Sequence, residues 1–218
     1  MIIVIDGPAG SGKSSTARAV ANRLSIEYLD SGALYRAVTL VYLEAGCEEE
    51  KFFSLLQKKD ISFYYRDQLF HIAIDGSSVT DDIRTAAVAE NVSEVAAMPD
   101  VRAFVNDLMR DVVKEGIYIA EGRDLGTAVF PDAELKFYMW ADLDERAQRR
   151  FDERKDKNPD LTFEQVKESI AQRDQKDASR EADPLKKADD AIEIDTTAMT
   201  FEQQVDEICW KVKQRIED

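Results

Sequence analysis

The sequence predicts an α/β fold in which a parallel five-stranded sheet is flanked by helices and carries a small antiparallel β insertion. Five short runs rich in apolar and β-branched residues have the length of buried strands: residues 2–6, 26–30, 117–121, 134–139 and 191–195. Segments with helical spacing alternate with these runs, which is typical of parallel sheets with crossover helices. Over residues 61–79 the spacing of apolar residues changes from the helical 3.6 residues to every second residue, and this change indicates the insertion.

The opening of the chain predicts a strand, a glycine-rich loop and a helix. Residues 2–6 (IIVID) form an almost wholly apolar run that breaks at Gly7-Pro8. After the loop, apolar side chains recur with the spacing i, i+3, i+4, i+7 at Ala17, Val20, Ala21 and Leu24. This spacing places the apolar side chains on one helix face, which we expect to pack on the sheet.

Helical patterns account for most of the remaining chain. We expect helices over residues 34–46, 52–58, 84–97, 99–114, 142–156, 162–177 and 200–216. The last two begin with capping-box patterns, Thr162 with Gln165 and Thr200 with Gln203. In such a box each side chain hydrogen bonds to the backbone of the other residue, so the start of each helix is well specified.

Two dipeptides mark turns within the antiparallel insertion. Arg66-Asp67 is a turn candidate, and Asp75-Gly76 is a common hairpin dipeptide. The chain of 218 residues is long enough for one core, because a domain of this size buries roughly 70% of its unfolded surface. We therefore expect a single domain, 1–218, that contains the insertion.

The composition excludes several classes of protein. Asp and Glu (44) outnumber Lys and Arg (29), and the formal net charge is −15, so the basic footprint of a nucleic-acid or anionic-lipid binder is absent. No apolar run approaches the length of about 20 residues that spans a membrane, and the first residues lack a signal-peptide pattern. Cys47 and Cys209 form no CxxC pair. We expect a soluble, cytoplasmic monomer that binds neither nucleic acid nor membrane.

The loop after the first strand matches the phosphate-binding pattern G-x-x-x-x-G-K-[ST]. Glycines let successive backbone N–H groups turn toward phosphate oxygens, and the following helix N-terminus adds favourable partial charge. Lys13 is expected to reach the β and γ phosphates, and the Ser14 hydroxyl to ligate Mg²⁺. The candidate ATP-binding residues are Gly7, Pro8, Ala9, Gly10, Ser11, Gly12, Lys13, Ser14 and Ser15.

Arginines follow the predicted strands at several points. Arg36 and Arg123 each come shortly after a strand, where the carboxyl ends of parallel strands face the ligand crevice. Arg173 and Arg180 are seven residues apart, so they share a face if that stretch is helical. Four guanidinium groups gathered in an acidic protein would bind several phosphates, which predicts phosphoryl transfer by charge stabilisation.

The residues leave the acceptor open. A phosphate acceptor is already ionised and needs no general base, whereas an alcohol would need a carboxylate such as Asp30, Glu121 or Asp124. A nucleotide-gated binding protein is a third possibility. The guanine-reading N-K-x-D and switch D-x-x-G patterns that such a protein would normally carry are absent from the sequence, which favours an enzyme.

The chain resembles the bacterial cytidylate kinases along nearly its whole length. The matching blocks are IDGPAGSGKSS at 5–15, YLDSGALYRAVTL at 28–40, EGRDLGTAVFPDAELKFY at 121–138 and QRDQKDASREADPLKKADDAIEIDTT at 172–197. The resemblance implies a P-loop nucleoside monophosphate kinase that transfers the γ-phosphoryl group of ATP, with Mg²⁺, to CMP and dCMP. It implies catalytic roles for Lys13, Arg123, Arg173 and Arg180.

The same resemblance implies how the substrate is held. Arg36, Arg123 and Arg180 would hold the acceptor phosphate, Arg173 and Asp177 the ribose, and Ser31, Ser93, Arg102 and Asp124 the base. A carboxylate that accepts from the cytosine N4 amino group is a favoured pairing, so Asp124 would prefer cytosine to uracil. The resemblance also implies a monophosphate-binding insertion at about 46–100 and a lid at about 142–177.

Overall fold

The computed structural model describes residues 1–66, 69–113, 115–156 and 158–217, and the chain divides into two compact units. One unit comprises Met1–Glu27 and Glu115–Asp218, and the other comprises Tyr28–Lys114. The first unit contains β1 (Ile2–Asp6), α1 (Lys13–Leu24), β6 (Tyr118–Glu121), the π-helical turn η2 (Leu125–Val129), β7 (Leu135–Trp140), α6 (Leu143–Arg154), α7 (Phe163–Ser179), β8 (Ile192–Asp195) and α8 (Phe201–Glu217).

The predicted five-stranded parallel sheet is confirmed. Its strand order is β2-β6-β1-β7-β8, with β2 (Glu27–Asp30) beginning where the two units meet in the chain. β1 pairs in parallel with β6 and with β7, so Ile3 lies opposite both Ile119 and Leu135. This central place explains why residues 2–5 are all apolar: both neighbours and both faces bury the strand, and Ile3, Val4 and Ile5 have no exposed surface.

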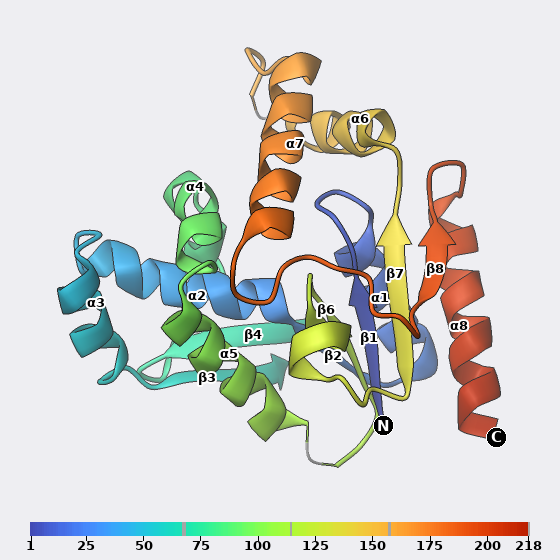
Figure 1. Cartoon of the computed structure of the whole chain (residues 1–218), viewed down its shortest axis with the longest axis horizontal. Helices are drawn as coiled ribbons and strands as arrows, with labels where there is room; N and C mark the ends of the chain where they lie inside the picture. The colour runs from blue at the N-terminus through green and yellow to red at the C-terminus, as the bar shows by residue number, and fades with distance from the viewer. Residues whose placement is uncertain (67–68, 114, 157, 218) are drawn as a thin grey trace. The chain divides into compact units, whose positions relative to one another are not determined.

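The parallel order of the strands brings distant segments of the chain together at the carboxyl ends of the strands. β1, β6, β7 and β8 run in the same direction, so the segments that follow Asp6, Glu121, Trp140 and Asp195 all begin at the same end of the sheet. Figure 1 shows the loop after β1 and helices α6 and α7 at this end of the strands. α1 and α8 pack against each other, and α1 also contacts β6.

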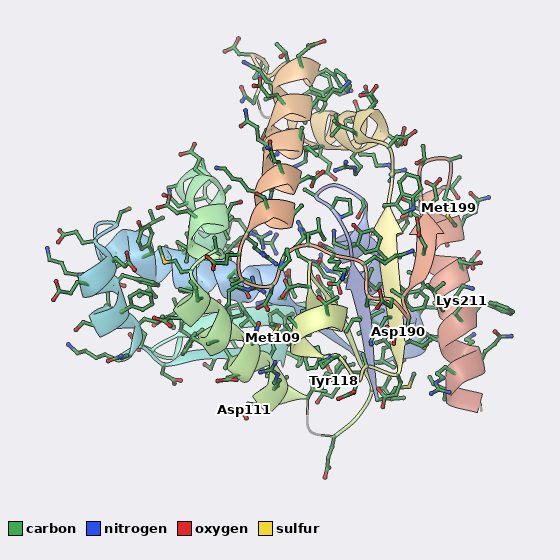
Figure 2. The ribbon with its side chains drawn as sticks, in the orientation of Figure 1. Met109, Asp111, Tyr118, Asp190, Met199 and Lys211 are labelled. Carbon is green, nitrogen blue, oxygen red and sulfur yellow. The ribbon has the colours of Figure 1, made fainter. Side chains whose placement is uncertain are left out.

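A buried lysine illustrates how the opposite end of the sheet is held. Lys136 on β7 donates from Nζ to the carbonyl oxygen of Pro131 at 2.5 Å and to the carboxylate of Asp190 at 2.7 Å. Asp190, labelled in Figure 2, precedes β8. This cation is structural, because its partners come from the loops that enter β7 and β8.

The second unit contains the insertion. Its elements are α2 (Ser31–Glu44), α3 (Glu49–Leu56), β3 (Ile61–Arg66), β4 (Leu69–Ile74), β5 (Ser77–Ser78), the 3-10 turn η1 (Asp82–Arg84), α4 (Ala86–Val95) and α5 (Pro99–Val112). β3, β4 and β5 form the predicted antiparallel sheet, and Asp75 and Gly76 form the expected turn with φ of 52° and 76°. The other turn candidate, Arg66-Asp67, falls partly outside the described residues.

The helix boundaries differ from the predicted ones in the second unit. The predicted helix over 84–97 is divided into η1 and α4, because the Thr85 hydroxyl caps α4 by accepting from the backbone N–H of Val88 at 3.5 Å. α3 begins at Glu49, three residues before the predicted 52–58 segment. Both predicted capping boxes, at Thr162 and Thr200, are confirmed. Among the described residues, no helix combines the length and apolar character that a bilayer crossing needs.

Candidate active site

The loop between β1 and α1 has a backbone that only glycine tolerates at its first and last turns. A Cβ at Gly7 would lie 1.9 Å from the carbonyl oxygen of Met139 on β7, so a side chain there would collide with backbone. Gly12 caps α1 with φ of 93°, in the left-handed region. The resulting loop lies at the N-terminus of α1, where N–H groups without helical partners favour an anion.

Lys13 is buried and turned toward its own loop. Its Nζ donates to the carbonyl oxygen of Pro8 at 2.6 Å and to the Ser11 hydroxyl at 3.3 Å. The pKa of Lys13 lies well below its usual value, because burial disfavours the charged form and the positive charge of Arg123 adds to that effect. A bound polyphosphate would supply the negative charge that such an ammonium group needs.

Ser14 meets a carboxylate from the neighbouring strand. Its hydroxyl donates to Oε1 of Glu121, the last residue of β6, at 2.7 Å. A hydroxyl beside a carboxylate is the hard oxygen donor set that suits Mg²⁺, which usually takes few protein ligands and completes its shell with water and phosphate. The described residues contain no cluster of three or more His, Cys, Asp or Glu side chains suited to a metal. The residues present therefore fit Mg²⁺ brought with a nucleotide.

Arg123 is fixed by a carboxylate on α7. Its Nε donates to Oδ2 of Asp177 at 3.0 Å, and its Nη1 donates to the carbonyl oxygen of Gly122 at 3.1 Å. Burial alone would lower the pKa of Arg123, but the carboxylates of Asp177 and Glu121 raise it above its usual value. Arg173, also on α7, is close enough to Lys13 for its charge to lower the pKa of that lysine. Lys13, Arg123 and Arg173 therefore belong to one site.

Arg180 pairs with Asp124 in a buried ion pair. Nη2 of Arg180 lies 2.7 Å from Oδ1 of Asp124, and the two side chains are only 6% and 5% exposed. α7 ends at Ser179 and Arg180 has an extended backbone, so the expectation that Arg173 and Arg180 share a helical face is wrong. The Nε of Arg180 instead donates to the carbonyl oxygen of Asp183 at 2.6 Å in the chain beyond the helix.

The other predicted substrate-binding residues lie in the unit Tyr28–Lys114. They are Ser31 and Arg36 on α2, Ser93 on α4 and Arg102 on α5. Arg102 is only 2% exposed; its Nη1 donates to the carbonyl oxygen of Ala96 at 3.2 Å, and its guanidinium carbon lies 5.5 Å from the centre of the Tyr35 ring. Asp30 caps α2 by accepting from the backbone N–H of Ala33 at 2.9 Å. Ser31 is thereby held at the first turn of α2.

Asp6 is a site residue that sequence reasoning missed. Its carboxylate accepts from the backbone N–H groups of Leu125 at 2.9 Å and Gly126 at 2.7 Å, and so fixes the segment that carries Arg123 and Asp124. Burial raises the pKa of Asp6 to about 6, although those two hydrogen bonds oppose the shift. The available signal was a carboxylate at the end of an apolar strand, directly before the glycine loop.

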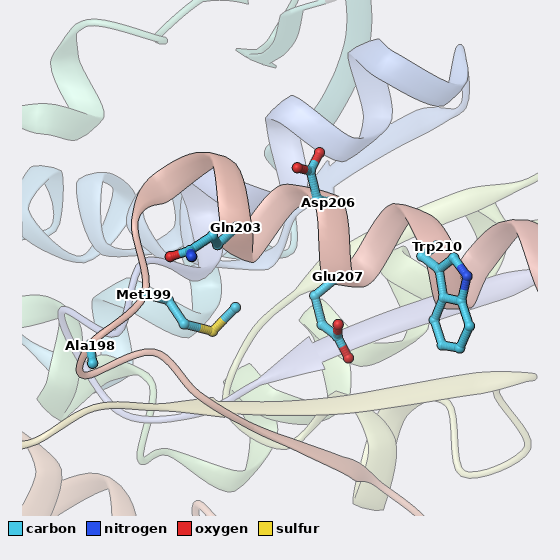
Figure 3. A pocket seen from close by; sticks show the side chains of 6 residues that line it. All are labelled: Ala198, Met199, Gln203, Asp206, Glu207 and Trp210. Atoms are coloured by element: carbon cyan, nitrogen blue, oxygen red, sulfur yellow. The ribbon is translucent and has the colours of Figure 1, made fainter.

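The surface also has a hollow on the outer side of α8. Figure 3 shows the side chains of Gln203, Asp206, Glu207 and Trp210 on α8 and of Met199 before it. The hollow has a volume of about 510 Å³ and contains none of the predicted site residues.

Comparison with known proteins decides the family. The family model described as cytidylate kinase matches residues 3–214. The chain belongs to the cytidylate kinase family. It is 43% identical over 208 residues to the cytidylate kinase of Carboxydothermus hydrogenoformans, with 94% of each chain covered. It is 44% identical over 219 residues to the cytidylate kinase of Streptococcus agalactiae serotype III, covering 99% of this chain and 96% of that one.

A solved structure shares the fold. An uncharacterised protein from Eubacterium ventriosum superimposes with a TM-score of 0.53 at 13% identity, covering 100% of this chain and 99% of that chain. As a member of the cytidylate kinase family, the chain is a nucleoside monophosphate kinase, and its substrates are nucleotides.

Proposed function

We propose that this kinase transfers the γ-phosphoryl group of ATP to CMP and dCMP, with Mg²⁺, to form CDP or dCDP and ADP. The observation that carries the proposal is the gathering of Lys13, Arg123 and Arg173 beside the glycine loop in a chain with a net charge of −15. Each cation is buried or partnered at the ends of the strands, where it would meet two phosphorylated ligands. The family membership supports the same reaction class.

The transfer needs positioning and charge more than covalent help. The backbone N–H groups of the loop would hold the β and γ phosphates of ATP. Lys13 would exchange the carbonyl oxygen of Pro8 for a phosphate oxygen as the nucleotide binds. Ser14, with Glu121 beside it, would hold Mg²⁺, and a bound Mg²⁺ would supply further neutralisation of phosphate charge. Arg123, Arg173 and Arg180 would stabilise the negative charge shared by the donor and acceptor phosphates.

The hydrogen bonds of the three candidate general bases favour a phosphate acceptor over an alcohol. The three candidate bases already accept hydrogen bonds: Asp30 from the backbone of α2, Glu121 from Ser14, and Asp124 from Arg180. A monophosphate is ionised at neutral pH and needs none of them as a base. A nucleotide-gated binding protein is disfavoured because the family consists of kinases.

We propose the following roles for the residues that would hold the acceptor nucleotide. Arg36, Arg123 and Arg180 would bind the acceptor phosphate, and Arg173 with Asp177 would bind the ribose. Ser31, Ser93, Arg102 and Asp124 would surround the base. The region at about 46–100 would form the monophosphate-binding insertion of the single domain, 1–218, and the region at about 142–177 would form the lid. We further propose a cytoplasmic monomer.

The base specificity can be tested with purified protein. ADP release is followed with CMP, dCMP, UMP, AMP and shikimate as acceptors, each with Mg·ATP. We expect kcat/KM for CMP and dCMP to exceed that for UMP by at least about 100-fold, because uracil would place its O4 acceptor against the Asp124 carboxylate and leave buried polar groups unpaired. Comparable values for CMP and UMP would contradict the assigned role of Asp124. Transfer to shikimate alone would contradict the phosphate acceptor.

The state of Lys13 predicts that ATP binding takes up protons. In the unliganded protein the pKa of Lys13 is lowered by burial and by Arg123. The fraction of Lys13 that is neutral therefore rises at a lower pH than for an ordinary lysine. A polyphosphate favours the charged form, raises the pKa and therefore draws a proton from solvent, up to one per site. Calorimetric titration with Mg·ATP at one pH in buffers of different ionisation enthalpy measures this uptake.

The matched control for proton uptake is Lys13→Arg. Arginine keeps the positive charge but does not deprotonate near neutral pH, so the variant is expected to bind with less proton uptake than the wild type. Equal uptake by the two proteins would show that Lys13 is fully charged before the nucleotide arrives.

A further inference from the structure

Ala9, the third residue of the phosphate loop, has both of its backbone polar groups held by one ion pair. Its N–H donates to Oδ1 of Asp174 at 3.0 Å, and its carbonyl oxygen accepts from Nη1 of Arg146 at 2.9 Å. The same Nη1 of Arg146 lies 2.5 Å from Oδ2 of Asp174. Arg146 belongs to α6 and Asp174 to α7, so one residue of the loop is held by side chains from two helices.

The arrangement in which the Arg146–Asp174 ion pair holds the backbone of Ala9, called the clasp below, is largely buried and borders an apolar core. The side chains of Arg146 and Asp174 are 9% and 20% exposed. The methyl group of Ala9 lies in a core formed with Ala147, Val166 and Ile170 of α6 and α7. In addition, Nε of Arg146 donates to the carbonyl oxygen of Ala141 at 2.8 Å, which ties the guanidinium to the end of β7. The loop and the base of α6 and α7 therefore share polar and apolar contacts.

Asp174 is also next to groups that the proposed reaction uses. Arg173 precedes it on α7, and Asp177, the partner of Arg123, follows one helical turn later. A shift of α7 relative to Ala9 would move Arg173 relative to Lys13. Since a misplacement of about 1 Å can lower the rate of a reaction about 100-fold, the clasp is placed where it can control turnover.

We propose that Arg146 and Asp174 are positioning residues, which hold α7 in register with the phosphate loop so that Arg173 and Lys13 act on the same phosphates. The inference rests on the proposed function, because it assigns these two residues to the transfer step. Every hydrogen bond described here for Arg146 and Asp174 joins protein groups, so they act through Ala9 and α7. Their role differs from that of Lys13, Arg123 and Arg173, which would contact the phosphates.

The test compares the clasp with a second ion pair across the same two helices. Lys167 on α7 pairs with Asp144 on α6, their side chains are 40% and 70% exposed, and no hydrogen bond described here joins either of them to the loop. The test variants are Arg146→Ala, Asp174→Ala, Asp174→Asn and the double variant Arg146→Ala/Asp174→Ala. The control variants are Asp144→Ala and Lys167→Ala. For each protein, kcat, the KM of ATP, the KM of CMP and the urea unfolding midpoint are measured.

We expect Asp174→Ala and Arg146→Ala to lower kcat about 10- to 100-fold, with the KM of CMP within about twofold of the wild type. Asp174→Asn keeps an acceptor for the Ala9 N–H but loses the charge facing Arg146, so its kcat should be intermediate. The double variant should be little worse than either single variant, because the pair acts as a unit. The control variants should keep the wild-type kcat.

Two results would overturn the proposal. One is a kcat that stays at the wild-type value in the folded clasp variants. The other is a loss that the control variants reproduce, since that would reflect only the packing of α6 on α7. A wild-type protein that fails to phosphorylate CMP would instead contradict the proposed acceptor. In that case the rise in melting temperature on adding Mg·ATP still tests the clasp: we expect a smaller rise in the clasp variants than in the controls, and equal rises would overturn the inference.

Discussion

Lys13→Ala is expected to lower kcat/KM for CMP by at least about 1,000-fold, which corresponds to ~4 kcal/mol of transition-state stabilisation. Lys13 is the cation within the glycine loop itself, and it is already desolvated, so its interaction with a phosphate would be strong. Steady-state rates of ADP formation at saturating and limiting ATP separate the effect on turnover from the effect on binding. A variant that keeps near-normal kcat would contradict the role of Lys13.

The structure predicts that this variant stays folded. Burial lowers the pKa of Lys13, which means that the charged form is disfavoured in the unliganded protein, so removing it relieves a penalty. The urea unfolding midpoint of Lys13→Ala should therefore be no lower than that of the wild type. Lys187→Ala is the matched control, because Lys187 is exposed and pairs with the exposed Glu193 at 2.6 Å. It should change neither activity nor stability measurably.

The parallel sheet could be predicted from sequence because burial on both faces leaves a recognisable apolar run in the central strand. Ile3, Val4 and Ile5 are apolar on both faces of β1, and only a strand in the middle of a covered sheet requires that pattern. The turn at Asp75-Gly76 was equally predictable, since both residues adopt positive φ there. The division of the 84–97 segment at Thr85 was not, because a threonine within a helical pattern can either face solvent or cap a new helix.

The partners of the site residues could not be predicted in the same way. The phosphate loop is a local pattern, and its residues are contiguous from Gly7 to Ser15. The pairing of Arg123 with Asp177 spans 54 positions and depends on where α7 meets the end of β6. The clasp on Ala9 spans 165 positions and appears in the sequence only as an acidic residue after Arg173. Residue type and spacing therefore indicated candidate groups, while the fold determined which of these groups touch.

The buried ion pair between Arg180 and Asp124 predicts a second large effect with two separable parts. Arg180→Ala removes the cation that lies 2.7 Å from the Asp124 carboxylate, which is 5% exposed, and breaking a buried pair in this way costs ~3–5 kcal/mol of unfolding free energy. The same change removes a proposed ligand of the acceptor phosphate, so kcat should fall at least about 100-fold. Urea unfolding and the rate of ADP formation with CMP measure the two effects on the same preparation.

The double variant Arg180→Ala/Asp124→Ala distinguishes stability from catalysis. Removing both charges eliminates the buried carboxylate that lost the Arg180 cation, so the double variant should be more stable than Arg180→Ala, but it should remain inactive toward CMP because the phosphate ligand is still missing. Arg23→Ala breaks an exposed pair with Glu202 and Asp206 on α8 and should leave turnover unchanged. If the double variant recovered turnover along with stability, Arg180 would be only a counter-ion for Asp124. Because Asp124 is also a proposed contact of the base, Asp124→Ala is measured beside the double variant, and a restabilised double variant with a lower kcat than Asp124→Ala would place Arg180 at the reacting phosphates.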